Sequence, residues 1–282
     1  MKIEEKISRQ KEAIDQQLKL ILSGKESLLF QAMRHTVFSG GKRFRPLLVL
    51  ASGECFGVKQ QTLLPFACAL ELIHNYSLIH DDLPSMDDDD WRRGQPSCHK
   101  AYGEDMALLA GDSLLTLAFE VMSQAPLEEG LKPAREKIIR EISQRAGMEG
   151  MIGGQFMDIT LHPEKMTEED YYQLIFKKTG SLILASLKTG AILGGASSSQ
   201  MNALEEYGRY MGFAFQLRDD IIDSLKEEKS VKPPRPNAVT LFGLEEAKRK
   251  LNTFVAEARG VLERAGLDSD ELCHLTSMLV ET

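Results

Sequence analysis

The spacing of apolar residues along the chain predicts helices almost throughout. Apolar side chains recur mostly at three- and four-residue steps, as in Leu204, Tyr207, Met211 and Phe215. This spacing places them on one face of a helix. Runs that alternate apolar and polar residues, as half-buried strands do, are scarce. The sequence therefore predicts an all-α fold.

Five stretches of turn-forming residues interrupt the helical pattern, at 23–25, 126–133, 162–167, 194–199 and 229–236. They separate eight to ten expected helices, with no long linker and no internal repeat. Thr167 is expected to cap one helix, and Gly266 to end another. Because 282 residues with 43% hydrophobic content can bury a large core, we expect a single domain over 1–282, built as a helical bundle.

Charge and cysteine content narrow the possible partners. The net charge is -8 and the pI is near 5.4, so the basic surface that binds nucleic acid or an anionic membrane is not expected. A small molecule is the favoured partner. The four cysteines form no Cys-x-x-Cys pair, which predicts reduced thiols in the cytoplasm and excludes a zinc cluster or disulfide framework. Neither a signal peptide nor a membrane span is expected.

The segment that follows His80 is dense in acidic residues. Its six carboxylates belong to Asp81, Asp82, Asp87, Asp88, Asp89 and Asp90. Such a cluster is favourable if it is fully solvated in a loop or neutralised by a cation. His74, Ser77 and Asp81 share a helical face, and Pro84 cannot continue the helix, so Asp87 is expected to loop back. Oxygen ligands of this kind suit Mg²⁺. A calcium loop is excluded because its required glycine position is Arg92.

A second acidic cluster lies inside a strongly helical segment. Gln216, Asp219, Asp220 and Asp223 follow i, i+3, i+4, i+7 spacing, so their side chains form one stripe. The flanking residues are apolar, which predicts partial burial. A solvated acidic face is the alternative interpretation, and a divalent-metal site is favoured over it. Two such clusters suggest several Mg²⁺ ions shared with a phosphorylated ligand.

Gly40-Gly-Lys-Arg-Phe-Arg-Pro46 combines glycines with three basic residues. It is not a Walker P-loop, because Thr36 and Arg43 occupy positions that such a loop needs for glycine and for serine or threonine. Glycine allows the backbone to approach an anion closely, and guanidinium groups bind phosphate oxygens. One interpretation of this stretch is therefore an anion-binding site. A plain basic turn is the other. A further set of residues typical of phosphate binding is Lys177-Lys-Thr-Gly180, although by itself it is a weak indication.

From Gly40 to about Asp223 the chain resembles the trans-prenyl diphosphate synthases, and bacterial farnesyl diphosphate synthases in particular. Five motifs carry the resemblance, in the order in which that family has them: 40–46, 80–87 with 92–94, Gly153-Gly154-Gln155 with Asp158, Lys178-Thr179, and 219–223. The resemblance implies an all-helical homodimer with a deep central cavity in each subunit. It also implies that the two aspartate-rich helices face each other across the mouth of that cavity.

The resemblance further implies a reaction that needs no side-chain nucleophile. An allylic diphosphate ionises to a carbocation, which joins the double bond of isopentenyl diphosphate and then loses a proton. Mg²⁺, three ions per site, would assist the departure of diphosphate. The metal ligands implied are Asp81, Asp82, Asp87, Asp219 and Asp223.

The same resemblance assigns basic and polar residues to the two substrates. Lys42, Arg45, His74 and Arg93 match the cradle for isopentenyl diphosphate, and Arg92 with Lys178 matches the contacts of the allylic diphosphate. Thr179 and Gln216 would direct dipoles at the carbocation. For each basic residue the competing interpretation is a surface ion pair. His80, His99 and Asp88 to Asp90 are expected to be ordinary helix-end, loop and solvated residues.

Product length is expected to depend on side chains below the first aspartates. Tyr76 and Ser77 lie one turn or slightly more before Asp81, and an aromatic ring there can block a growing chain. The four-residue spacer 83–86 resembles the bacterial short-chain class. Farnesyl diphosphate is therefore the predicted product and geranylgeranyl diphosphate the alternative.

The chain departs from the family's pattern after Asp223. The lysines that usually follow are not clearly placed in 224–243, where Lys226, Lys229 or Lys232 could substitute, or three prolines could stiffen a lid. This departure leaves a non-catalytic prenyl-synthase-like subunit as a rival, although such a protein would be expected to lose aspartates. A terpene cyclase needs no cradle for isopentenyl diphosphate. A His-Asp phosphohydrolase would need more spaced His and Asp ligands.

Overall fold

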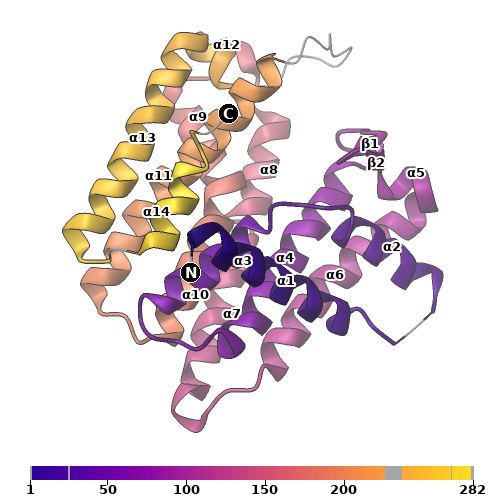
Figure 1. Cartoon of the computed structure of the whole chain (residues 1–282). Helices are drawn as coiled ribbons and strands as arrows, with labels where there is room; N and C mark the ends of the chain where they lie inside the picture. The colour runs from indigo at the N-terminus through magenta and orange to yellow at the C-terminus, as the bar shows by residue number, and fades with distance from the viewer. Residues whose placement is uncertain (1, 25, 226–236, 268, 281–282) are drawn as a thin grey trace. The chain divides into compact units, whose positions relative to one another are not determined.

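The computed structural model describes residues 2–24, 26–225, 237–267 and 269–280. These residues form helices α1 to α14 and one two-stranded hairpin (Figure 1). The predicted all-α class is therefore confirmed. The chain divides into two compact units, each described by itself below. Unit 1 comprises Met1–Leu50 with Val58–Ile139, and unit 2 comprises Ala51–Gly57 with Arg140–Thr282. The single domain over 1–282 stays a prediction.

Unit 1 is built around one helix that is buried on nearly every side. Its elements are α1 (Ile3–Ile21), α2 (Leu28–Val37), α4 (Gln60–Asp81), β1 (Trp91–Arg92), β2 (Gln95–Pro96), α5 (Cys98–Tyr102), α6 (Glu104–Gln124) and η1 (Glu129–Leu131), with the first parts of α3 (Phe44–Glu54) and α7 (Lys132–Ala146). Helix α4 is apolar around its whole circumference, as core helices are, and Leu63, Phe66 and Leu70 are at most 1% exposed. It packs against α6 and α1.

The only strands among the described residues form a hairpin directly after the acidic segment. Trp91 pairs with Pro96 and Arg92 with Gln95 in antiparallel register. Between them, Arg93 and Gly94 have φ of 54° and 76°. Positive φ at both central residues is what a type I′ turn requires, and this turn matches the twist of the flanking strands. The hairpin was not predicted, because two-residue strands are too short to produce an alternating pattern.

Unit 2 places two long helices side by side, α11 and α13 (Figure 1). Its elements are α8 (Met151–Thr160), η2 (Pro163–Lys165), α9 (Glu168–Ile175), η3 (Phe176–Gly180), α10 (Ser181–Leu193), α11 (Ser198–Leu225), α12 (Ala238–Phe242), α13 (Leu244–Ala265) and α14 (Asp270–Ser277). Thr167 caps α9 in a reciprocal capping box with Asp170, and Gly266 ends α13 in the left-handed conformation. Both predicted helix boundaries are therefore confirmed.

The predicted number of helices, eight to ten, was too low for the described parts of the chain. Helices α5 and α12 have five residues each, too few to display a periodic pattern. Each is separated from the next long helix by one glycine, Gly103 with φ 92° or Gly243 with φ 79°. A single glycine can turn the chain there because it has no Cβ. Of the predicted breaks, 229–236 and residue 25 lie outside the described residues; the others separate helices.

Two helices, α4 and α6, are long and apolar enough to span a membrane by length and composition alone. The apolar window of α4 is 72% buried inside unit 1, as in the core helix of a globular protein. The window of α6 is only 33% buried. One or two such helices are weak indications of a membrane span, so the sequence-based prediction of none stays a prediction.

Candidate active site

The first aspartate cluster lies where α4 ends, as the position of Pro84 predicted. Helix α4 stops at Asp81. The chain then reverses, so that the backbone amide of Asp87 donates to the carbonyl of Asp81 at 2.8 Å and that of Asp88 to Leu83 at 3.1 Å. Asp81 and Asp87 are half-buried, whereas Asp82 is 2% exposed. The predicted return of Asp87 toward Asp81 is thus present in the backbone.

Asp82 differs from its neighbours because a guanidinium group neutralises it. Arg92 Nε donates to both carboxylate oxygens, at 3.0 and 3.2 Å, and Arg92 Nη2 donates to Oδ1. Burial raises the pKa of Asp82, while the bonds from Arg92 lower it. A carboxylate so buried needs such a partner. The hairpin explains the arrangement, since it turns β1 so that Arg92 reaches back to the end of α4.

The predicted cradle for isopentenyl diphosphate assembles within unit 1. Arg93, at the tip of the hairpin, donates through Nη1 to the carbonyl of Gly40. The φ of Gly41 is 136°, which only glycine adopts readily, and a Cβ there would lie 2.9 Å from Arg93 Nη1. Lys42 is exposed beside them, and Arg45 is 7% exposed in the first turn of α3. The glycine-rich stretch and the second arginine of the acidic motif therefore form one basic cluster.

His74 lies among these arginines in its neutral form. Burial, and then the positive charges of Arg45, Arg93, Arg92 and Arg43, hold the pKa of His74 well below its usual value. An additional proton on His74 would be repelled, so the imidazole can donate one hydrogen bond without adding a charge. Arg45 and Arg93 add positive charge at this place, whereas Arg43 and Arg92 are ion-paired with Glu71 and Asp82. Such an arrangement suits a multiply charged anion.

Tyr76 and Ser77 continue the same helix one turn before Asp81. Tyr76 is 5% exposed, and its ring edge faces His80 at 5.7 Å. Its buried hydroxyl has no hydrogen-bond partner among the described residues, and burial, with Asp81, raises its pKa to about 12. Ser77 donates to the carbonyl of His74 at 2.9 Å. The Tyr76 side chain therefore fills buried space on α4 without a polar contact for its hydroxyl among the described residues.

His80 and His99 have structural roles. His80 Nε2 lies 3.1 Å from the carbonyl of Leu108, and a Cβ on Gly111 would lie 2.1 Å from the same nitrogen, so His80 fixes α4 against α6. His99 Nδ1 lies 3.0 Å from Ser97 Oγ. Both predictions of ordinary histidines agree with these contacts.

The three later aspartates are largely exposed and lie near basic side chains. Asp89 lies 3.7 Å from Arg92 Nη2, Asp90 lies 2.9 Å from Lys100 Nζ, and Asp88 lies 4.0 Å from His99 Nε2. The ligand atoms of Asp88, Asp90 and His99 are close enough together to hold a cation. Lys100 already supplies positive charge to Asp90. The side chains of Asp88, Asp89 and Asp90 are 59%, 40% and 59% exposed, which agrees with the predicted solvated charge, and Arg92 and Lys100 add surface ion pairs to it.

In unit 2, Lys178 and Thr179 lie in a π-helical segment, η3. Single π-turns within helices are common at functional sites. Close glycine contacts confine the segment on two sides. A Cβ on Gly154 of α8 would lie 2.2 Å from the Lys178 backbone nitrogen, and one on Gly212 of α11 would lie 2.6 Å from Gly180 Cα. The first contact explains Gly154 physically, and a Cβ on Gly153 would lie 1.9 Å from the Met148 carbonyl oxygen.

The side chains of η3 are joined to both neighbouring helices. Lys178 Nζ lies 2.5 Å from Asp158 Oδ2 on α8. Thr179 Oγ1 donates to Gln216 Oε1 on α11 at 2.8 Å, and Gln216 Nε2 donates to Asp220 Oδ1 at 2.9 Å. The sequence motifs around 154, 178 and 216 therefore meet in one place.

Asp220 anchors structure rather than presenting a free carboxylate. Its Oδ2 accepts from the Tyr171 hydroxyl at 2.7 Å and from the Ala238 amide at 2.6 Å. Burial raises its pKa and these bonds lower it. The stripe from Gln216 to Asp223 is helical as predicted, but its members differ. Asp219 is 43% exposed and lies 3.6 Å from Arg218 Nη1, and Asp223 is exposed.

The donors present fit Mg²⁺ in their chemistry. Asp81 and Asp87 in unit 1, and Asp219 and Asp223 in unit 2, offer carboxylate oxygens, the ligand type that this ion prefers. Asp82 has the same type of donor, but an ion there would share the carboxylate with Arg92. That the two aspartate clusters face each other across a cavity stays a prediction.

Two buried residues that bind charged side chains were not assigned from the sequence: Glu71, which accepts from Arg43, and Tyr171, which donates to Asp220. Glu71 is the single carboxylate in the apolar segment 63–79, and it is 2% exposed. A lone charge in such a segment signals a buried ion pair. Tyr171 carried no comparable signal, since its contact with Asp220 spans 49 residues.

Residues 26–242 match the polyprenyl synthetase family. The farnesyl diphosphate synthase of Geobacillus stearothermophilus is 37% identical over 289 residues, which cover 99% of this chain and 97% of that protein. The geranylgeranyl diphosphate synthase of Cyanophora paradoxa is 38% identical, with 88% and 86% covered. The crystal structure of an FPP/GFPP synthase from Zymomonas mobilis superposes with a TM-score of 0.89 at 35% identity, covering 99% of each chain.

Proposed function

Because the chain belongs to the polyprenyl synthetase family, we propose that it is a prenyltransferase that condenses isopentenyl diphosphate with dimethylallyl or geranyl diphosphate, head to tail, to give farnesyl diphosphate. The observation that carries the proposal is the basic cluster of unit 1. There the charges of Arg45 and Arg93 act on His74 and lower its pKa, and Arg93 donates to the carbonyl of Gly40, two residues before Lys42. Such a cluster matches a diphosphate, which brings several negative charges and many acceptor oxygens.

In the proposed reaction the allylic carbon–oxygen bond breaks and diphosphate leaves with the electron pair. Arg92 and Lys178 bind that diphosphate, which competes with their present partners Asp82 and Asp158. Thr179 and Gln216 direct their dipoles at the carbocation, supported by the bond between them. The cation adds to the double bond of isopentenyl diphosphate, and one proton then leaves. No side chain forms a covalent intermediate.

Mg²⁺ is the proposed cofactor, three ions per site, held by Asp81, Asp82, Asp87, Asp219 and Asp223. When bound, it would supply Lewis-acid stabilisation of the negative charge that develops on the leaving diphosphate. The chain's own contribution is to present carboxylates at the ends of α4 and α11, where helices fix their backbone.

Incubation of the purified protein with isopentenyl and geranyl diphosphates and Mg²⁺ tests this proposal. Phosphatase treatment followed by chromatography should release farnesol. Geranylgeraniol would instead support the alternative activity, in keeping with the geranylgeranyl diphosphate synthases among the relatives. A cyclic hydrocarbon would indicate a cyclase, and inertness without a partner a non-catalytic subunit. Either of the last two outcomes would overturn the proposed function.

Replacement of Tyr76 by alanine is expected to lengthen the product. The ring is buried and its hydroxyl has no partner among the described residues, so truncation removes bulk without breaking a polar contact. We expect the space left by the ring to accommodate a longer prenyl chain. Radio-chromatography of the dephosphorylated products should shift from C15 toward C20 alcohols, whereas Tyr76→Phe should keep the parent profile. An unchanged profile for Tyr76→Ala would remove Tyr76 from this role.

A homodimer is proposed from the exposed apolar surface of α6. Leu108 and Leu109 are 48% and 46% exposed on a helix whose apolar window is only one-third buried. A helix that is apolar around most of its circumference is normally covered by other protein. In unit 2, Ile152, Phe156 and Ile159 form a second exposed apolar stripe on α8. A second copy of the chain is the proposed cover.

Leu109→Glu should therefore convert the dimer to monomers in sedimentation velocity. A buried, unpaired carboxylate at the interface costs more than dimerisation recovers. Leu20→Glu is the matched control, since Leu20 is 68% exposed on α1 and this variant should stay dimeric. A monomeric parent, or an undisturbed Leu109→Glu dimer, would contradict the proposal.

The two units are further proposed to form one catalytic domain over 1–282, working in the cytoplasm. All four cysteines are free thiols, which supports a reducing compartment. The proposed partners are the two diphosphate substrates and a second copy of the chain, without nucleic acid.

A further inference from the structure

Arg43 is one of two buried basic residues in the 40–46 motif, and Arg45, at 7% exposed, is the other. Lys42 before it is exposed, whereas Arg43 is 5% exposed. Its φ is 53°, in the left-handed region that residues other than glycine rarely adopt. Such a conformation persists only where its surroundings strongly favour it. The contacts of the side chain therefore hold the backbone in this form.

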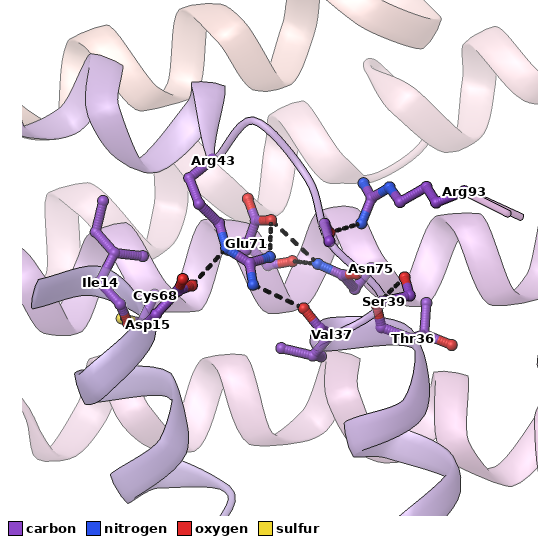
Figure 2. A network of polar contacts seen from close by, with 11 residues as sticks. Ile14, Asp15, Thr36, Val37, Ser39, Arg43, Cys68, Glu71, Asn75 and Arg93 are labelled. Atoms are coloured by element: carbon purple, nitrogen blue, oxygen red, sulfur yellow. Dashed lines mark hydrogen bonds and ion pairs between the residues drawn. The ribbon is translucent and has the colours of Figure 1, made fainter. Parts of the chain in front are cut away.

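The guanidinium group of Arg43 joins three helices (Figure 2). Nε donates to Asp15 on α1 at 2.7 Å, and Nη2 donates to the Val37 carbonyl at the end of α2 at 2.8 Å. Nη1 donates to Glu71 on α4 at 2.9 Å. Burial lowers the pKa of Arg43, but the pairs with Glu71 and Asp15 raise it overall. A planar fork with several donors suits this task, which a lysine could not fill.

This network determines where the predicted phosphate-binding residues lie. The Arg43 carbonyl accepts the first hydrogen bond of α3, from Leu47 at 3.0 Å, so anchoring Arg43 fixes the start of that helix and the position of Arg45. On α4, Glu71 precedes His74 by less than one turn, and Asn75 donates to the Glu71 carbonyl and carboxylate at 2.8 and 3.4 Å. The Arg43–Glu71 pair thus connects both sides of the basic cluster.

We infer that Arg43, through its ion pair with Glu71, is a positioning residue for the isopentenyl diphosphate subsite, an inference that rests on the proposed function. It does not contact the substrate. It holds Lys42 and Arg45 at a fixed distance from His74, so that their donors converge on one diphosphate. A displacement of about 1 Å can cost roughly 100-fold in a site of this kind.

The double variant Arg43→Met/Glu71→Met separates positioning from stability. Replacing both members of a buried ion pair by apolar residues is often neutral for stability, whereas removing one member is strongly destabilising. The double variant should therefore melt close to the parent, and the single variant Arg43→Met well below it. If Arg43 only stabilises the fold, the double variant should also regain full substrate affinity.

We expect the KM of the double variant for isopentenyl diphosphate to exceed that of the parent by about tenfold or more. Its KM for the allylic substrate should equal that of the parent. Lys188→Met is the matched control. Lys188 lies 2.7 Å from Glu205 and 3.5 Å from Glu141 in unit 2, with 11% of its side chain exposed. Its loss should lower the melting temperature and leave both KM values unchanged.

Calorimetric binding of isopentenyl diphosphate, without the allylic substrate, makes the test independent of turnover. Weaker binding by the double variant than by the parent supports the inference, even if the parent proves unable to elongate a chain and the proposed function fails. Equal binding by the two proteins overturns the inference while elongation by the parent upholds the proposed function. A parent that binds no isopentenyl diphosphate overturns both.

Discussion

Replacing Asp81 with asparagine is expected to reduce kcat by roughly 10²–10³-fold, the effect of removing one group that stabilises developing charge. Asp81 is the last residue of α4, and its carbonyl accepts from the Asp87 amide. Asparagine keeps this backbone contact and the side-chain volume, but it removes the negative charge proposed to hold Mg²⁺. The concentration of Mg²⁺ needed for half-maximal activity should rise as well. Steady-state kinetics across a magnesium titration measure both effects.

Asp112→Asn provides the control for that experiment. Asp112 is an aspartate of the same unit, on α6, with 60% of its side chain exposed and no assigned part in catalysis. Its replacement should leave kcat and the magnesium dependence unchanged. If Asp81→Asn behaved like Asp112→Asn, the proposed role of the first aspartate cluster would be wrong.

Gly154→Ala is expected to disable the enzyme by a different route. The new Cβ would lie 2.2 Å from the Lys178 backbone nitrogen and 2.6 Å from its Cα, and backbone atoms cannot move aside as a flexible side chain can. Either α8 or η3 must shift, which displaces Lys178 and Thr179. Overpacking of this kind costs about 1–3 kcal/mol, or several degrees of melting temperature at roughly 2–4 °C per kcal/mol. The value of kcat/KM should fall about 100-fold.

Gly130→Ala is the matched control, because a Cβ there meets nothing within 4 Å. Gly130 lies in η1, outside the five sequence motifs. Calorimetry should find its melting temperature unchanged, and its kinetics should equal those of the parent. Wild-type kinetics in Gly154→Ala would instead mean that η3 tolerates displacement. The close packing of α8 on η3 would then have no catalytic consequence.

Much of the local structure follows from patterns that the sequence displays directly. Pro84 predicts the end of α4 close to Asp81, since proline cannot continue the backbone ladder. Thr167, followed by acidic residues, predicts the start of α9, where the structure shows a capping box with Asp170. The stripe from Gln216 to Asp223 is helical as its spacing predicted. These features depend on residues within about one turn of each other, so the sequence contains all the information they need.

The partners of charged side chains were much less predictable. Arg92 was assigned to a substrate, and the structure pairs it with Asp82 through the hairpin. Asp88 to Asp90 were expected to be solvated, and Lys100, His99 and Arg92 lie beside them. Asp219 and Asp220 are neighbours in sequence and face different surroundings, since Asp220 alone is bonded to Tyr171.

By itself, the sequence determined the helical class and several helix ends, because periodicity and caps are properties of neighbouring residues. Tertiary structure alone decided which charged side chains point inward and what they contact. Lys42, Arg43 and Arg45 look alike in sequence, yet Lys42 is exposed and Arg43 joins α1, α2 and α4. Its carboxylate partners Asp15 and Glu71 each lie 28 residues away. Pairing over that distance depends on how the helices pack, which no local pattern encodes.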